Sequence, residues 1–375
     1  MSAPRRLAAS AALLAACLLA ACSSSTKRPD PTPLQSFEPK LQAPLAWSQR
    51  MAGIPTPLSL AVMRDVVVAA DHDGNVEARS VSNGASLWRG SAGDRLTAGV
   101  GSDGRYAAVV TRQNELVTFD RGAVKWRRTL PTRVVTAPLV AGERVFVLGI
   151  DRVVRAFDGQ DGRSLWTQQR PGDALSLSQA SVIIPFKDTL LVGQGSRLAG
   201  LDPTSGMVRW DVPISSPRGT NEVERLADLV APAARVGNII CARSYQITVS
   251  CANAERGVLV WTRNVGGDEG VAADSQYVYG ADASDRLTAW SIADGNVAWN
   301  SAAFAYRSLS APAVTPSALI VGDAQGMVHF LARDSGQTLQ RVATDGSPID
   351  AAPVVVGNTV IVATRNGGLF AYKLP

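Results

Sequence analysis

The sequence has few of the residues from which catalytic and metal sites are usually built. Its 375 residues include only two histidines and four cysteines, and charged residues make up 18% of the chain. No spacing of cysteine and histidine fits a zinc site, and no Gly-x-Ser-x-Gly sequence offers a serine nucleophile. His329 lies in an apolar β-rich run and is predicted to pack in the core. The sequence therefore offers few candidate catalytic residues, and we expect neither a metal nor a cofactor.

Long runs of like charge are also missing. The net charge is +5, and no block of five or more like charges occurs, so nucleic acid is not an expected partner. Apolar residues are plentiful at 46%, which is enough for a real core. Glycine and proline, at 33 and 21 residues, are as frequent as an all-β chain with many turns requires.

The first residues have the layout of a secretory signal. Arg5 and Arg6 precede an apolar stretch over residues 7–19. The letters LAAC at residues 19–22 resemble the lipobox of bacterial lipoproteins, in which the cysteine is lipidated and becomes the N-terminus. We therefore expect a signal peptide over residues 1–21 and a lipid on Cys22. The same letters at residues 14–17 would lipidate Cys17 instead and leave two leucines at the lipid surface; simple secretion is the other alternative.

The next segment, residues 22–44, is predicted to be a lipidated, flexible tether, because it is rich in serine, threonine and proline. By analogy with other lipoproteins, Ser24 after the cysteine indicates the outer membrane. No other stretch is apolar for 18 residues, so nothing else in the sequence is predicted to span a membrane.

Beyond the tether, one pattern recurs about every forty residues. A turn-like stretch contains a glycine, and a tryptophan follows four residues later. The tryptophans stand at positions 47, 88, 126, 166, 210, 261 and 299, and Gln340 holds the next corresponding position. Self-similarity at this period indicates a repeat architecture.

Each repeat holds four short runs of β-branched and aromatic residues and shows no helical period, which predicts four strands. Four-stranded units of about forty residues are typical of β-propeller blades. The last unit lacks its fourth strand, whereas residues 45–48 form a spare tryptophan strand. We therefore predict an all-β, eight-bladed propeller over residues 45–375, with antiparallel blades and a ring that the N-terminal strand closes beside Ala371 and Tyr372.

The repeat also decides how to interpret the stretch AFDGQDGRSLW, residues 156–166, whose aspartates suggest a calcium loop. The positions of Asp158 and Asp161 hold serine, alanine, asparagine or arginine in several sister repeats. A calcium ion needs six to eight oxygen ligands, which such loops do not supply. The glycine is the near-constant residue, and it suits a turn with positive φ, so we interpret the stretch as a turn.

Two cysteines lie outside the N-terminal segment, and they flank a predicted hairpin whose turn is near Gln246. Cys241 and Cys251 would then stand opposite each other, close enough for a disulfide. An exported protein meets an oxidising compartment, so we predict that they are joined. Two buried free thiols are the alternative.

One connection between repeats is about ten residues too long. The interval from Trp210 to Trp261 is 51 residues, and the excess lies in residues 213–231. The preceding connection, residues 172–179, also carries exposed apolar residues. Connections of this kind emerge on one face of a propeller, so the two loops should be neighbours. They indicate a binding surface, with ordinary loop variation as the alternative.

These features together resemble the BamB family of lipoproteins, which belong to the outer-membrane β-barrel assembly machinery. The likeness covers the lipobox, the tether, eight repeats of quinoprotein type and the loop EVERLAD at residues 222–228. It implies a non-enzymatic scaffold that binds the periplasmic POTRA domains of BamA, with the rest of that complex and unfolded outer-membrane proteins as further partners.

The family binds its partner through a Leu-x-Leu-Arg stretch and an Arg-Leu-x-Asp-x-Asp stretch. The resemblance places these on the two neighbouring loops. The matching positions are Leu175, Leu177, Ser178, Arg225, Leu226 and Asp228. Ser178 stands where the family has arginine, and Val230 replaces the second acid, so the patch is less charged than the family pattern.

Two other functions fit parts of the sequence. A quinoprotein dehydrogenase shares the repeat, but such enzymes have adjacent cysteines and a clustered acidic calcium site, which the sequence lacks. A lipoprotein that binds a cell-envelope polymer such as peptidoglycan is the second alternative, and binding to purified wall material would distinguish it.

Overall fold

The computed structural model describes residues 28–51, 59–170, 175–217, 220–221 and 225–375. The chain divides into two compact units, residues 1–31 and 32–375. The second unit is described here; the predicted signal and residues 22–27 of the predicted tether, Cys22 among them, lie outside the described residues. Within the described ranges, no helix has the length and hydrophobicity needed to span a bilayer.

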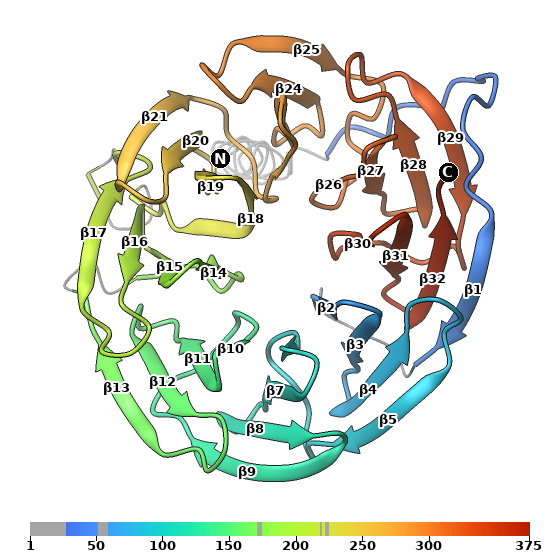
Figure 1. The fold of residues 1–375 in the computed structure, drawn as a ribbon. Helices are drawn as coiled ribbons and strands as arrows, with labels where there is room; N and C mark the ends of the chain where they lie inside the picture. Colours follow the sequence, from blue (N-terminus) through green and yellow to red (C-terminus); the bar gives the residue numbers. More distant parts are fainter. Residues whose placement is uncertain (1–27, 52–58, 171–174, 218–219, 222–224) are drawn as a thin grey trace, which may run out of the picture. The chain divides into compact units, whose positions relative to one another are not determined.

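Residues 32–375 form eight antiparallel sheets of four strands each, arranged in a ring (Figure 1). We number the blades by chain order. Blades 1 and 2 consist of β2 (Ala61–Met63), β3 (Val66–Ala70), β4 (Asn75–Ser80) and β5 (Ser86–Ser91), then β6 (Gly101–Ser102), β7 (Tyr106–Val110), β8 (Glu115–Asp120) and β9 (Ala123–Thr129). Blades 3 and 4 consist of β10 (Leu139–Ala141), β11 (Arg144–Leu148), β12 (Val154–Asp158) and β13 (Ser164–Gln168), then β14 (Ile183–Phe186), β15 (Thr189–Gln194), β16 (Arg197–Leu201) and β17 (Val208–Pro213).

Blades 5 and 6 consist of β18 (Leu229–Val236), β19 (Ile239–Ser244), β20 (Thr248–Asn253) and β21 (Val258–Arg263), then β22 (Ala272–Ala273), β23 (Tyr277–Ala281), β24 (Leu287–Ser291) and β25 (Val297–Ser301). Blade 7 consists of β26 (Ala313–Val314), β27 (Leu319–Gly322), β28 (Met327–Leu331) and β29 (Thr338–Ala343). Blade 8 joins both ends of the chain: β30 (Val354–Val356), β31 (Thr359–Ala363) and β32 (Gly368–Lys373) pair in order, and β1 (Leu45–Arg50) supplies the outer strand.

The predicted eight-bladed propeller is therefore confirmed, including its closure. β1 pairs antiparallel with β32, and Trp47 lies opposite Ala371. Because β1 pairs with it, β32 has no unpaired outer edge.

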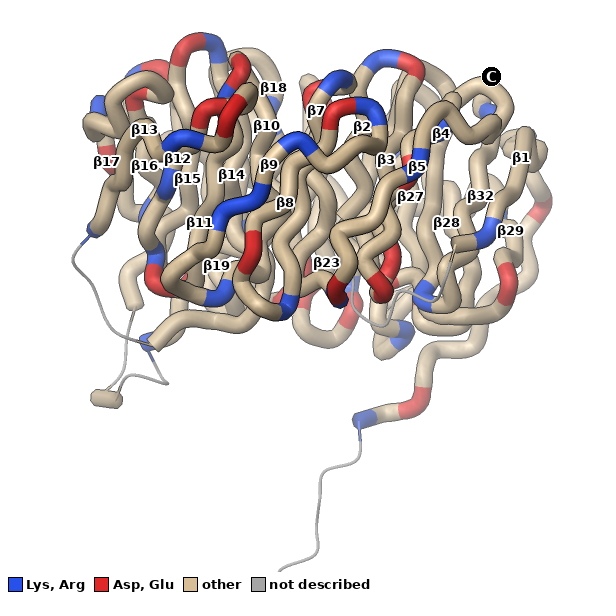
Figure 2. Tube along the Cα trace, turned by 90° about the horizontal axis from the view of Figure 1, so that it is seen from below, with Lys and Arg blue, Asp and Glu red and all other residues tan. Residues whose placement is uncertain are grey.

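The ring has two distinct faces. One face carries the connections between blades and the hairpins between the second and third strands; we call it the loop face. The other carries the hairpins that contain the repeated glycines; we call it the turn face. Figure 2 views the blades edge-on, with the C-terminus at the turn face.

The core lies between neighbouring blades rather than inside any one of them. A single buried cluster contains Tyr106 and Leu116 of blade 2 together with Val140 and Val145 of blade 3. A four-stranded sheet has two apolar faces and cannot cover both alone, so each blade depends on its neighbours.

Six of the repeat tryptophans reach across to a turn glycine of the next blade. The indole Nε1 of Trp126 donates a hydrogen bond to the carbonyl oxygen of Gly159 at 3.0 Å. Its ring lies against Gly162, where an added Cβ would be 2.5 Å from the indole Cδ2. In the sequence, the glycine precedes the tryptophan of its own repeat by four residues. In the structure, the glycine contacts the tryptophan of the preceding blade.

The same contact recurs around the ring. The tryptophan–glycine pairs are Trp47–Gly84, Trp126–Gly162, Trp166–Gly206, Trp210–Gly257, Trp261–Gly295 and Trp299–Gly336. We call this contact the interblade staple. The Trp47 pair joins blade 8 to blade 1, so it fastens the seam.

The aspartates of the stretch at residues 156–166 serve the turn itself. Asp158 Oδ1 accepts the amide of Gln160 at 2.8 Å, and Asp161 Oδ1 accepts the amide of Arg163 at 2.8 Å. Gly162 has φ of 70°. The side chains cap turn amides, as short polar residues do in such turns.

A disulfide joins Cys241 and Cys251 across β19 and β20, where the two residues are register partners. Both are fully buried beside Trp261. The bridge therefore lies inside the core between blades 5 and 6, away from solvent.

The interblade staple predicts that two glycine-to-alanine changes lower the free energy of unfolding by different amounts. Gly162→Ala combines a positive φ with a clash against Trp126, and we expect it to lower the free energy of unfolding by about 2–4 kcal/mol. Gly237→Ala has φ of +56° but nothing within 4 Å of the added Cβ, so about 1 kcal/mol is expected. Urea denaturation of both variants measures the difference; equal losses would show that the tryptophan contact adds nothing.

Candidate docking site

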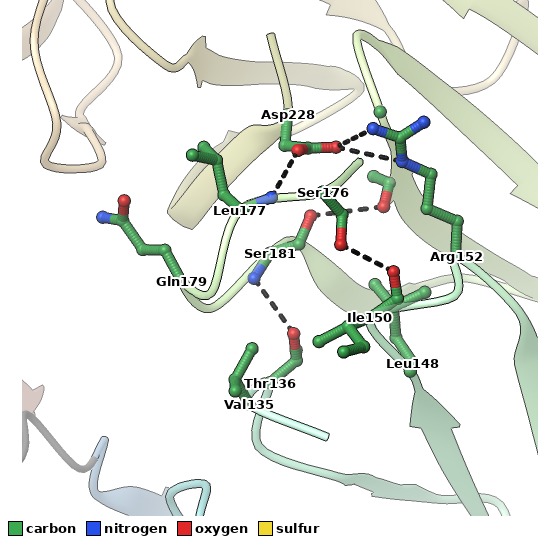
Figure 3. A pocket seen from close by; sticks show the side chains of 13 residues that line it. Val135, Thr136, Leu148, Ile150, Arg152, Ser176, Leu177, Gln179, Ser181 and Asp228 are labelled. Atoms are coloured by element: carbon green, nitrogen blue, oxygen red, sulfur yellow. Dashed lines mark hydrogen bonds and ion pairs between the residues drawn. The ribbon is translucent and has the colours of Figure 1, made fainter. Parts of the chain in front are cut away.

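The two loops singled out in the sequence meet on the loop face. One connects β13 to β14 and carries Leu175, Leu177 and Ser178; the other connects β17 to β18 and carries Leu226 and Asp228. Figure 3 shows Asp228 and Leu177 side by side. Residues 171–174, 218–219 and 222–224 of these loops lie outside the described residues.

Asp228 holds the two loops together from below the surface. It is only 7% exposed. Its Oδ2 accepts the backbone amide of Leu177 at 2.9 Å, and its Oδ1 accepts Nε of Arg152 at 3.1 Å. A carboxylate with these partners is not available to a second protein, so Asp228 positions the site and does not form its outer surface.

Arg152 is the residue that the sequence did not reveal. It belongs to the hairpin between β11 and β12, and its Nη2 lies 3.0 Å from Asp228 Oδ1. The same Nη2 donates to the carbonyl oxygen of Leu175 at 2.8 Å. Arg152 therefore links a third segment to both loops. Topology was the available signal, since hairpins of this type share the loop face with the interblade connections.

A serine hydroxyl adds a further hydrogen bond between the β13–β14 loop and the β11–β12 hairpin. Ser176 Oγ donates to the carbonyl oxygen of Ile150 at 2.7 Å, on the same β11–β12 hairpin. The hollow between these segments has a volume of about 30 Å³. That is room for one water molecule rather than for an organic cofactor.

The side chains that face outward are mostly apolar or uncharged. Leu175 is 37% exposed. Ser178 is exposed, whereas Leu177, Arg225 and Leu226 are half-buried. Val230, at the position of the family's second acid, is fully buried in β18. The arrangement presents leucines on a backbone that is fixed by buried hydrogen bonds, which suits a docking surface better than a reaction site.

An acidic pair borders the site toward the ring's centre. Gln179 Nε2 donates to the carbonyl oxygen of Asp268 at 2.6 Å. Burial raises the pKa of the neighbouring Glu269 to about 8, and the negative charge of Asp268 adds to the shift. Burial lowers the pKa of Arg243 to about 10, although Asp268 opposes this. A carboxyl group with this pKa is largely protonated at neutral pH, so Glu269 adds little negative charge to this part of the loop face.

We predict that Asp228→Ala loosens the leucine loop. The change removes the acceptor of the Leu177 amide, and a hydrogen bond to a charged group contributes about 1.5–3 kcal/mol. Amide hydrogen exchange at residues 175–179 should accelerate by about 10- to 100-fold. Leu226→Ala, on the same loop but without a bond to Leu177, is the control and should leave that exchange unchanged. Unaltered protection in Asp228→Ala would contradict the positioning role.

Comparison with known proteins places the chain in a family. A family model described as outer membrane protein assembly factor BamB matches residues 72–301. The assembly factor BamB of Burkholderia pseudomallei is 35% identical over the whole of both chains. The one from Bordetella pertussis is 32% identical over 92% of this chain and 91% of its own.

Solved structures agree on the fold. The crystal structure of BamB from Moraxella catarrhalis superposes with a TM-score of 0.81, covering 88% of this chain and 99% of that one at 22% identity. A quinohemoprotein alcohol dehydrogenase from Comamonas testosteroni gives 0.69 at 12% identity, covering 93% and 81%. The second likeness shows a shared propeller and nothing about chemistry. With a third of its residues identical to the curated relatives from end to end, the chain belongs to the BamB family of outer membrane protein assembly factors.

Proposed function

We propose that this chain is a non-enzymatic scaffold of outer-membrane protein assembly, held at the periplasmic side of the outer membrane by a lipid on Cys22. Its curated relatives are named as assembly factors. The observation that carries the proposal is the leucine loop, whose backbone Asp228 and Arg152 fix while Leu175 stays exposed.

The partner that we propose is BamA, through its periplasmic POTRA domains. The docking contact would be mainly apolar, because Ser178 replaces the family's arginine and Asp228 is already paired with Arg152. Apolar contacts between leucines and a complementary surface are little affected by salt, whereas exposed ion pairs are screened.

The test is binding of residues 30–375 to purified BamA POTRA domains. Wild type should bind, and Leu175→Asp/Leu177→Asp should bind at least about tenfold more weakly, since each charge would be buried without a partner. Met207→Asp is the matched control: Met207 is 71% exposed at the other end of blade 4, so its change should leave the affinity as it is. Affinity should also vary little with ionic strength.

Two results would contradict the proposal. If the folded wild type does not bind, BamA is not the partner, and purified peptidoglycan becomes the next ligand to test. If the double variant binds as well as wild type, the partner docks elsewhere on the ring.

The lipid anchor yields a separate prediction. Several acyl chains, at about 0.8 kcal/mol per buried CH₂, bind a protein firmly to a bilayer. Cys22→Ala should therefore move the protein from the membrane fraction to the soluble periplasm and abolish labelling by radioactive palmitate, while Cys17→Ala should change neither. The opposite pattern would assign the lipid to Cys17.

A further inference from the structure

The segment before β1 is not free of the propeller. Its first residue in this unit, Thr32, donates its amide to the carbonyl oxygen of Ala305 at 2.9 Å. Arg307 Nη1 donates to the carbonyl oxygen of Thr32 at 3.1 Å. Ala305 and Arg307 belong to the β25–β26 connection, so Thr32 lies on the loop face.

The segment then lies along the outside of β29 (Figure 1), and its hydrogen bonds to Ala305 and Leu339 show that it runs toward the turn face. Arg341 of β29 donates from Nη2 to the carbonyl oxygen of Gln35 at 3.3 Å, and its guanidinium lies 5.0 Å from the centre of the Phe37 ring. Further on, Lys40 donates its amide to the carbonyl oxygen of Leu339 at 2.9 Å. We call residues 32–44 the strap.

Apolar contacts and a buried ion pair hold the strap. Leu34 packs against the cluster that contains Phe304, and Leu41 packs against the cluster that contains Tyr372. Arg307 is itself fixed by Asp323, whose Oδ2 lies 2.7 Å from Arg307 Nη2 and 3.0 Å from Nε2 of the buried His329. The strap is therefore a structured part of the ring, where the sequence predicted a flexible tether up to residue 44.

The strap changes the face from which the chain leaves the propeller. β1 begins at Leu45, opposite Tyr372, which lies at the turn face beside the C-terminus. A tether that ended at Leu45 would leave from the turn face. Because the strap runs back along β29, the chain leaves instead beside Arg307, on the loop face that also carries Leu175 and Leu177.

The remaining distance to the lipid is short. Thr32 follows Cys22 by ten residues, which span about 35 Å when fully extended. As a flexible coil they would reach about 16–19 Å. A tether free up to residue 44 would be about twice as long and would start from the opposite face.

We propose that the strap orients the propeller so that its loop face, with the docking leucines, faces the phospholipid surface. The inference rests on the proposed lipid anchor at Cys22. It assigns the strap to the placement of the site relative to the membrane, with Arg307 and Arg341 as the residues that hold it.

Energy transfer from the protein to the bilayer tests this orientation. The full-length lipoprotein, extracted from membranes, is reconstituted in vesicles of phosphatidylethanolamine and phosphatidylglycerol that contain a headgroup acceptor dye. Donor dyes are attached singly at Gln325→Cys, on the loop face, or at Ser335→Cys, on the turn face. Both positions are exposed, and they flank the two ends of β28. Cys241 and Cys251 are buried in their disulfide and take no label.

The label at residue 325 should be quenched at least about twofold more strongly than the label at residue 335, because strand β28 and its turns separate them along the blade. Equal quenching, or stronger quenching at residue 335, overturns the proposal. Flotation of the vesicles is measured in the same samples. If the protein does not float with the vesicles, both the lipid anchor at Cys22 and the proposed orientation are refuted. The POTRA-binding assay is carried out in solution, so its result does not depend on either of them.

A variant of the strap tests whether the strap sets the orientation of the propeller. Leu34→Ser/Phe37→Ser removes the two large apolar side chains from the part of the strap nearest the loop face and leaves Leu41 and every blade unchanged. We expect it to release that part of the strap and so abolish or reverse the difference between the two labels. Gln35→Ser/Glu38→Ser changes two exposed residues of the same segment and should behave as wild type. If the two double variants give the same quenching ratio, the strap does not set the orientation.

Discussion

At six of the eight junctions of this ring, one blade is fastened to the next by an indole that packs on a turn glycine. The contact works because the glycine has no side chain and a positive φ, so the tryptophan approaches the turn backbone closely and donates to a nearby carbonyl. Repetition of this contact sets a constant relation between neighbouring blades. The contact holds blades 3, 4 and 5 in a fixed arrangement. The two docking loops connect these blades on the loop face, and they meet there for that reason.

The one outer strand without a tryptophan has a topological reason. Gln340 stands where the other outer strands carry tryptophan, and it faces blade 8, whose third and fourth strands come from opposite ends of the chain. No hairpin joins β32 to β1, so no turn glycine exists there to receive an indole. The strap packs at this position instead, through Leu41 and the Lys40–Leu339 hydrogen bond.

Much of this architecture was predictable because it repeats. The forty-residue period, the four strands and the closing strand all follow from patterns that occur several times. Arg152 was not predictable, because an arginine in a surface hairpin has no local mark that distinguishes an internal ion pair from a solvated side chain. The strap was missed because its prolines suggest disorder, whereas the spacing of Leu34, Phe37 and Leu41 was the signal that it packs. Asp228 was placed in the correct loop, but only the structure reveals that it faces inward.

The strap also determines how the molecule carries load. If a lipid on Cys22 anchors the chain, as proposed, a force applied through it would reach Thr32 first, at the loop face, where Arg307 and Ala305 hold it. Because the strap extends from that point along β29, a pull away from the loop face acts along the strap and would load its contacts with Arg341 and Leu339 together, in shear. β1 runs in the opposite direction and begins at the turn face, so the same pull arriving directly at Leu45 would fold the chain back and open the β1–β32 ladder one hydrogen bond at a time. The strap thus shields the closing strand from the direction of pulling in which its ladder is weakest.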